Sequence, residues 1–335
     1  MLMLLQILFV ACSEDSSVTD EPQGSPLHLT SVTRANSQFT PDNNSKIRIY
    51  VMNKSDQYST GTFSGASWTN AGVTVKEHEQ YYMYGFMPEL EGYGSSISAT
   101  SADLNGDYSK GADLTLSNLP IFTSQDICAV VGVQRISSAS DAKNIVEGNY
   151  GYLSGLKDDN YLNLLMDHLY SKLILKINVD KDYSLLRDIK LKSVTLTCTY
   201  GTNVNVTIKL RAGYGLQGNA NTYSPTSNGN QSHPLFTNTN GELIPSNDKS
   251  PLSLGSVNCP PVVLDASGTY MKISCDYDVY DKKGNLLRKC TNVENKLKAT
   301  NVNHGMEYTV TLTVAPTYLY VLSDDDLNNP TIKIN

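Results

Sequence analysis

The 335-residue sequence has one Trp, few charged residues and an excess of acidic over basic side chains. Charged residues make up 18% of the chain, and the formal net charge is −7. Proteins that bind nucleic acid usually carry clusters of Lys and Arg that contact phosphates. The composition therefore argues against nucleic acid as a partner, and its 40% hydrophobic content indicates a globular body.

Motifs of common catalytic and metal sites are also absent from the sequence. No GxSxG, P-loop or GxGxxG appears in a strand-turn-helix context, and no CxxC or HExxH indicates a zinc or redox site. We therefore predict that the chain is not an enzyme and has no cofactor and no metal ligand. The histidines are scattered, and none has a ligand spacing: His28, His78, His168, His233 and His304.

The first eleven residues form the longest apolar run, MLMLLQILFVA. A membrane-spanning helix needs about 20 apolar residues, whereas the apolar core of a secretory signal peptide needs about 7–15. The run ends Phe9-Val10-Ala11-Cys12, which looks like a lipobox, so we expect residues 1–11 to be a signal peptide and Cys12 to be lipidated. No Lys or Arg precedes the run, and a buried N-terminal strand is the alternative.

Residues 13–26 are acidic and then rich in Pro, Gly and Ser, which is typical of a flexible tether. Ser13-Glu14-Asp15 resembles the acidic signal that directs some Gram-negative lipoproteins to the outer face of the outer membrane. If Cys12 carries lipid, an odd number of cysteines remains, and the sequence assigns no disulfide among them: Cys128, Cys198, Cys259, Cys275 and Cys290.

Alternation of apolar and polar residues recurs along the chain and predicts half-buried β-strands. The clearest segments are 46–53, 172–180, 203–210, 271–280 and 308–314. In residues 188–198 the apolar positions change parity near Lys192-Ser193, which predicts a β-bulge. Gly284-Asn285 is typical of a hairpin turn. One short helix is expected within residues 138–148, and the fold class is all-β.

Loop-like sequence before residue 164 indicates a domain boundary. We predict an N-terminal β-sandwich domain over residues 35–163 and a C-terminal β-sandwich domain over residues 164–335. Residues 212–255 are rich in Asn, Gly, Ser and Thr, and predict a long projecting loop, either passive or binding.

Several stretches follow one another along the chain: the lipobox with its tether, LHLTSVTRANSQF from Leu27, YYMYGFMPE from Tyr81, SQDICAVVGV from Ser124, NLLMDHLYSKLILKINV from Asn163 and VNHGMEYTVTLTV from Val302. In their order and spacing they resemble the fimbrillin family of type V pilins. The resemblance implies two transthyretin-like β-sandwich domains in tandem and a structural subunit of a cell-surface fimbria that supports adhesion. The final TIKIN lacks the aromatic residue that many relatives place there.

The resemblance also implies a route of maturation. The precursor would be a lipid-anchored outer-membrane protein, and a trypsin-like protease would cut after Arg34, leaving Ala35 as the new N-terminus. Residues 12–34 would then leave as the tether and a removable first strand, which alternation places at 27–33. An ordinary Arg in a loop is the alternative.

Polymerisation in the family proceeds by strand exchange between subunits, here into a homo- or hetero-polymer with other fimbrial subunits. The expected donor strand is Thr331, Ile332, Lys333 and Ile334, where the two Ile side chains share one face. The alternative is that this strand closes its own domain.

Two other functions stay open at this point. The chain could be a tip adhesin or surface glycan-binding lipoprotein that does not polymerise, with Trp68 and scattered Tyr stacking on a host glycan or contacting a host protein. A hydrolase with an unrecognised site ranks last, because the sequence shows no nucleophile with a base and no carboxylate pair.

Overall fold

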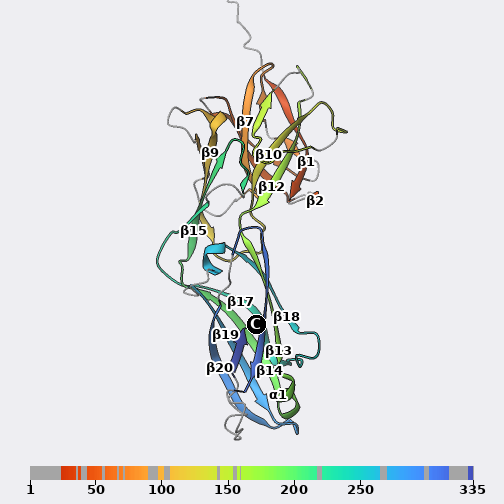
Figure 1. Cartoon of the computed structure of the whole chain (residues 1–335), viewed down its shortest axis with the longest axis vertical. Coiled ribbons are helices and arrows are strands. Elements are labelled where there is room, and N and C mark those ends of the chain that lie inside the picture. The colour runs from red at the N-terminus through yellow and green to blue at the C-terminus, as the bar shows by residue number, and fades with distance from the viewer. Residues whose placement is uncertain are drawn as a thin grey trace, which may run out of the picture.

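The computed structural model describes residues 24–34, 37–38, 44–54, 57–65, 68–70, 72–89, 97–101, 106–141, 144–153, 157–158, 160–216, 221–264, 270–297, 302–316 and 331–334. The molecule is elongated and is built almost entirely of strands, which confirms the all-β prediction (Figure 1). Among the described residues, no helix is long and apolar enough to cross a membrane.

Ten strands form the main sheet of the N-terminal half. They are β1 (Ser25–Arg34), β2 (Ser37–Gln38), β3 (Lys46–Met52), β4 (Gln57–Ser64), β5 (Thr69–Asn70), β6 (Thr74–Val75), β7 (Gln80–Met87), β10 (Cys128–Ile136), β11 (Gly151–Leu153) and β12 (Asn160–His168). The order is β2-β1-β12-β10-β7-β3-β4-β5, with β11 on β7 and β6 on β1. β1 runs parallel to β12, whereas the other pairs in this sheet are antiparallel.

One face of this sheet encloses its own hydrophobic core. Alternate side chains of β1, β3, β7, β10 and β12 meet there, together with Phe63 of β4 and with Trp68. β1 and β5 stand far apart in the strand order, yet they lie against each other, so the sheet curls around this core. We call it the inner core.

A second sheet covers the other face of the main sheet. Its strands are β8 (Ile97–Ser101), β9 (Gly111–Pro120), β15 (Asn203–Arg211) and β16 (Asn221–Pro225), in the order β16-β15-β9-β8. Leu114 and Leu116 of β9 and Ile208 of β15 belong to one cluster with Tyr84 and Phe86 of β7. Segments from both halves of the sequence therefore form one sheet.

The C-terminal half is a sandwich of two four-stranded sheets. One has the order β18-β13-β21-β22 and the other β17-β14-β19-β20. Their bounds are β13 (Ser171–Val179), β14 (Asp188–Cys198), β17 (Gln231–Leu243), β18 (Leu252–Cys259), β19 (Met271–Tyr280), β20 (Leu286–Leu297), β21 (Glu307–Ala315) and β22 (Thr331–Ile334). Their inward side chains continue the cluster beneath the second sheet, so the two halves share one core.

The regular helices are short. α1 (Lys181–Leu186) begins after Asp180, whose carboxylate accepts hydrogen bonds from the Asp182 and Tyr183 amides at 3.1 and 3.2 Å, as an N-cap does. The 3₁₀ helices are η1 (Tyr108–Lys110) and η3 (Pro261–Leu264). The helix expected within residues 138–148 is wrong for the residues described there, which form bends, turns and irregular backbone.

Two local predictions are confirmed. The pairing register of β14 shifts between Leu191 and Ser193 against both neighbouring strands, which is the expected bulge. β19 and β20 form the expected hairpin, and Gly284 in its turn has a φ of +86°, which glycine adopts without strain.

The predicted domain limits need correction. The boundary between residues 163 and 164 cuts through β12, which pairs with β10 along its length. The predicted loop at 212–255 is wrong, because β16, β17 and the start of β18 lie within it. β17 has no fully buried residue, so its sequence lacks the apolar alternation that marks a half-buried strand.

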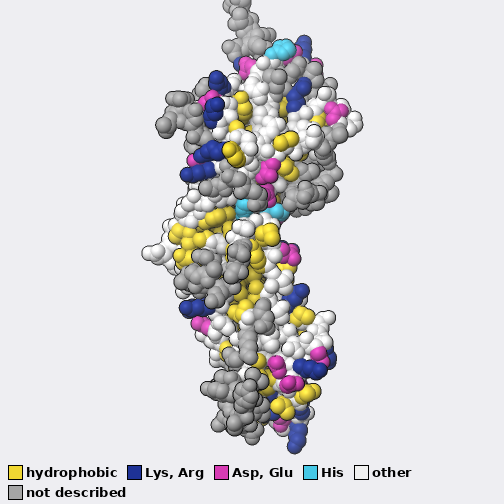
Figure 2. All heavy atoms as spheres, in the orientation of Figure 1, with side chains coloured by type: hydrophobic (Ala, Val, Ile, Leu, Met, Phe, Trp, Pro, Cys, Tyr) yellow, Lys and Arg dark blue, Asp and Glu magenta, His cyan; other side chains and the backbone are white. Residues whose placement is uncertain are grey.

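Residues 121–127, between β9 and β10, lie against the C-terminal sandwich. The Thr123 and Asn258 backbones exchange hydrogen bonds of 3.0 and 2.9 Å. The Phe122 ring lies 5.4 Å from the ring of His233 in β17. On the face shown in Figure 2, hydrophobic side chains gather around the middle of the molecule, and charged ones lie mainly toward its two ends. Residues 121–127 therefore connect the N-terminal half to the C-terminal sandwich through hydrogen bonds and ring contacts.

The stability of this junction is expected to depend on pH through His233. Partial burial lowers the pKa of its imidazole, so the unfolded chain binds the proton more readily than the folded one. The free energy of unfolding should therefore fall as the pH drops through about 6.5. Urea denaturation across that range should show that the free energy of unfolding depends less on pH in His233→Gln than in the parent chain. His28→Gln, a substitution at an exposed site, is the control and should keep the pH dependence of the parent chain. An unchanged pH dependence in His233→Gln would refute the role of His233.

Candidate functional site

The predicted removable strand, residues 27–33, lies within β1. In the sheet order β1 is next to last, with β12 on one side and the two-residue β2 on the other. Its backbone pairs with β12 from Leu27 opposite Asn160 to Arg34 opposite Met166. β1 therefore supplies the backbone hydrogen-bonding partner of β12 on this side of the sheet.

The inward face of β1 carries three apolar side chains. Leu27 and Val32 are fully buried and Leu29 is 5% exposed, and all three contribute to the inner core. Strict alternation would place Val32 on the face opposite to Leu27 and Leu29. The register shifts between Leu29 and Ser31, and this bulge turns Val32 inward.

A polar contact also fixes β1. Ser31 is 3% exposed, and its hydroxyl donates a 2.7 Å hydrogen bond to Oδ1 of Asn163 in β12. Asn163 in turn donates to the side-chain oxygen of Gln134 at 3.1 Å. Buried polar groups need such partners, so removing β1 would leave Asn163 to find another donor.

Arg34 is the last residue of β1, and it pairs antiparallel with Ser37 of β2. The bond expected to be cut, between Arg34 and Ala35, thus lies at the β1–β2 connection and not within a long loop. Ala35 and the predicted lipidation residue Cys12 lie outside the described residues.

The predicted donor strand is β22, which pairs antiparallel with β21 at the end of its sheet. Ile332 is 3% exposed within the sandwich, and Ile334 is partly buried against the same core. The Asn295 amide donates a 2.8 Å hydrogen bond to the Ile332 carbonyl. In this state β22 closes its own domain, and its register sets Lys333 opposite Thr313 and Thr331 opposite Ala315.

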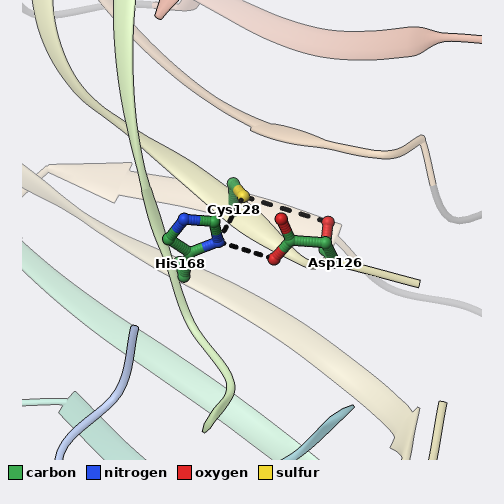
Figure 3. A group of neighbouring side chains, drawn as sticks. All are labelled: Asp126, Cys128 and His168. Atoms are coloured by element: carbon green, nitrogen blue, oxygen red, sulfur yellow. Dashed lines mark hydrogen bonds and ion pairs between the residues drawn. The ribbon is translucent and has the colours of Figure 1, made fainter. Parts of the chain in front are cut away.

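Asp126, Cys128 and His168 form a compact cluster where β10 begins and β12 ends (Figure 3). Cys128 and His168 face each other across the antiparallel pair. Nδ1 of His168 lies 2.7 Å from Oδ1 of Asp126 and 3.6 Å from Sγ of Cys128. Cys128 is fully buried, whereas the Asp126 and His168 side chains are 36% and 26% exposed.

This cluster does not have the arrangement of a catalytic triad. In such a triad one imidazole nitrogen contacts the nucleophile and the other contacts the carboxylate. Here both the thiol and the carboxylate lie against Nδ1. Among the described residues, these three form the group whose ligand atoms are close enough to hold a metal ion.

Motif spacing in the sequence does not reveal this cluster, because His168 is 40 residues from Cys128. The available signal was local: Asp126 and Cys128 are two residues apart, so they fall on one face of an extended segment. The register that places His168 opposite them could not be predicted from spacing.

None of the five described cysteines forms a disulfide bond, and all five are buried. Burial raises the pKa of the Cys275 thiol to about 12, with a smaller contribution from the Asp276 carboxylate. Burial likewise raises the pKa of the Cys198, Cys259 and Cys290 thiols. These four side chains behave as small hydrophobic groups and not as nucleophiles.

Trp68 cannot stack on a sugar, because its ring is buried. It is 6% exposed and belongs to the inner core. The glycan-binding alternative therefore loses the residue that supported it most directly.

Comparisons with known proteins identify a shared fold. No family model matches the chain, and no curated protein does. A fimbrial protein from Bacteroides vulgatus, at 13% identity, superposes with a TM-score of 0.54 over 92% of this chain and 98% of its own. At this identity the similarity shows a common all-β fold alone.

Two further solved structures superpose less well. A candidate cell adhesion protein from Bacteroides uniformis gives a TM-score of 0.40 at 13% identity, covering 88% of this chain and 92% of its own. Candidate polysaccharide-binding proteins from Bacteroides thetaiotaomicron give 0.37 at 8% identity, covering 90% and 98%. Scores this low add nothing to the fold assignment.

Proposed function

We propose that this chain is a structural subunit of a cell-surface fimbria that supports adhesion. In this proposal it is exported as a lipoprotein through Cys12, matured by cleavage after Arg34, and polymerised by strand exchange. The observation that carries the proposal is β1, a near-edge strand that contributes Leu27, Leu29 and Val32 to the inner core and ends at Arg34. The fold shared with a fimbrial protein of Bacteroides vulgatus supports it.

Removal of β1 would have two physical consequences. The β12 edge would lose its parallel partner, and unpaired N–H and C=O groups would be exposed. The space that held Leu27, Leu29 and Val32 would open as an apolar groove. A strand with suitably spaced apolar side chains can pair with the exposed backbone groups of β12 and fill the apolar groove, as in donor-strand complementation.

β22 is the proposed donor. It is short and lies at the end of its sheet, so its departure leaves the β13–β21 pairing in place. Ile332 and Ile334 are two residues apart on one face, which matches the spacing of Leu27 and Leu29. Domains of the transthyretin type remain part of this proposal.

A non-enzymatic role is favoured by the absence of a triad in the Asp126–Cys128–His168 cluster. The alternative of a glycan-binding tip adhesin is weakened by the burial of Trp68. The proposed partners are other fimbrial subunits, a trypsin-like maturation protease and a host protein or glycan, with the outer membrane reached through lipid.

The proposal predicts that limited trypsin treatment of the full chain converts monomers into SDS-resistant ladders. Arg34→Gln should stay monomeric because the β1–β2 connection is not cut there. Arg187→Gln, which removes an Arg after α1, is the matched control and should assemble like the parent chain. Gel electrophoresis with N-terminal sequencing for Ala35 measures both. Ladders from Arg34→Gln equal to those of the control would refute cleavage at Arg34 as the trigger.

A further inference from the structure

We propose that Asp126, Cys128 and His168 bind one Zn²⁺ ion. Each residue offers one ligand atom, and these atoms all lie within 4.8 Å of one another. Cysteine sulfur, imidazole nitrogen and carboxylate oxygen are the ligand types found in protein zinc sites. The soft thiolate favours zinc over calcium or magnesium, which prefer oxygen ligands alone.

The distance between the sulfur and the nitrogen is suitable for a shared ion. With Zn–S about 2.3 Å and Zn–N about 2.1 Å, tetrahedral geometry separates the two ligand atoms by about 3.6 Å. Cys128 Sγ and His168 Nδ1 are 3.6 Å apart. These side chains can therefore bind the ion with little rearrangement.

Asp126 must move slightly. Its Oδ1 is 2.7 Å from His168 Nδ1, a hydrogen-bond distance. An ion held between nitrogen and oxygen separates them by about 3.4 Å, so the carboxylate has to retreat by less than about 1 Å. Asp126 precedes β10 and its side chain is 36% exposed, so it has room to do this.

The backbone that holds the ligands is well fixed. Cys128 and His168 are direct partners in the β10–β12 ladder, and Asp126 precedes Cys128 by two residues. Beside this ladder, the Leu169 amide donates a 2.7 Å hydrogen bond to the Ile127 carbonyl. Ligands on strands are positioned more accurately than ligands on loops.

The site opens on a pocket between the two halves of the molecule. Asp126 and His168 line this pocket, whose volume is about 400 Å³, and Cys128 lies buried beside them. Its other walls come from the C-terminal half and from the turn before it: Tyr170, Lys172, Asn258, Gly305, Met306 and Glu307. An ion there has access to solvent for a fourth ligand.

Binding requires a change of protonation. The Cys128 thiol must lose its proton to solvent so that the thiolate can bind, and the proton on His168 must reside on Nε2. The carboxylate of Asp126 binds without proton loss. Zinc binding should therefore release a proton, and the calorimetric enthalpy should depend on the buffer used.

The test is zinc titration of the full chain after removal of metal with a chelator. Calorimetry should give one Zn²⁺ per chain, and zinc should raise the thermal unfolding midpoint. Cys128→Ser, His168→Asn and Asp126→Asn should each weaken binding, by about 100-fold or more for the first two. Cys290→Ser replaces another buried cysteine outside the cluster, so it is the control and should bind zinc as the parent chain does.

A measurement on the unmodified chain does not depend on whether the variants fold. Co²⁺ should give a thiolate-to-cobalt charge-transfer band and the visible bands of a tetrahedral site. Absence of stoichiometric zinc binding, absence of the thiolate band, or equal binding by Cys128→Ser and Cys290→Ser would each overturn the proposal. The cluster would then be a His–Asp ion pair against a buried thiol.

Discussion

Locking β22 to β21 with a disulfide is expected to abolish assembly, and reduction is expected to restore it. Thr313 and Lys333 face each other in the β21–β22 register, so Thr313→Cys with Lys333→Cys places two thiols on neighbouring strands. If β22 leaves its own sheet to complete a neighbour, the oxidised chain cannot donate it. Ladders after cleavage at Arg34 should then fall to background.

The same protein serves as its own reference, because reductant releases the strand without changing the sequence. A second disulfide, Lys272→Cys with Lys296→Cys, joins β19 to β20 in the same sandwich and leaves β22 free. That control should assemble in both redox states. Gel filtration and SDS gels of trypsin-treated samples measure the outcome. Full assembly of the oxidised β21–β22 variant would show that β22 is not the donor.

Truncating the inward face of β1 is expected to destabilise the monomer strongly. Leu27 is fully buried in the inner core, and Leu→Ala at such positions lowers the free energy of unfolding by about 2–5 kcal/mol. Because β1 is a near-edge strand, it should also detach more often and let trypsin cut after Arg34 faster.

His28→Ala is the matched control for Leu27→Ala. His28 is the next residue of the same strand, but its side chain is exposed and lies beside the Tyr161 ring at 5.2 Å. Its loss should change the free energy of unfolding by about 0.5 kcal/mol or less. Urea denaturation and the rate of cleavage measure the difference. Equal effects of the two substitutions would mean that the inward face of β1 does not hold the strand in place.

The sequence predicted strands best where one face is buried. Residues 172–180, 203–210 and 271–280 alternate, and β13, β15 and β19 occupy them. β17 has no fully buried side chain, so its residues look like a loop. The bulge in β14 was predictable because it shifts a long apolar series, whereas the bulge in β1 interrupts a short one.

The sequence did not predict which strands pair with one another. β15 pairs with β9 across about 90 residues of sequence, as the Thr115–Thr207 side-chain contact illustrates. Alternation shows which face of a strand is buried but not against which strand it lies. The same limitation hid the Asp126–Cys128–His168 cluster, whose members meet only through the β10–β12 register.

The sequence contains 21 Tyr residues. Several of their rings are buried, and their hydroxyls form hydrogen bonds inside the protein. The Tyr84 hydroxyl donates to the Tyr108 carbonyl at 2.8 Å, and the Tyr152 hydroxyl donates to Asn160 Oδ1 at 3.0 Å. Burial raises the pKa of Tyr152 to about 12, so it remains a neutral donor. Tyr thus supplies core volume together with internal hydrogen bonds.

The exchange of strands between the two halves has a mechanical consequence. The chain passes from one half to the other after β12, returns after β14 to form β15 and β16, and crosses again before β17. A pulling force along the long axis would therefore be divided among several covalent connections and a continuous core, instead of loading one linker. The junction between the two halves should therefore resist extension, which suits a subunit that transmits tension.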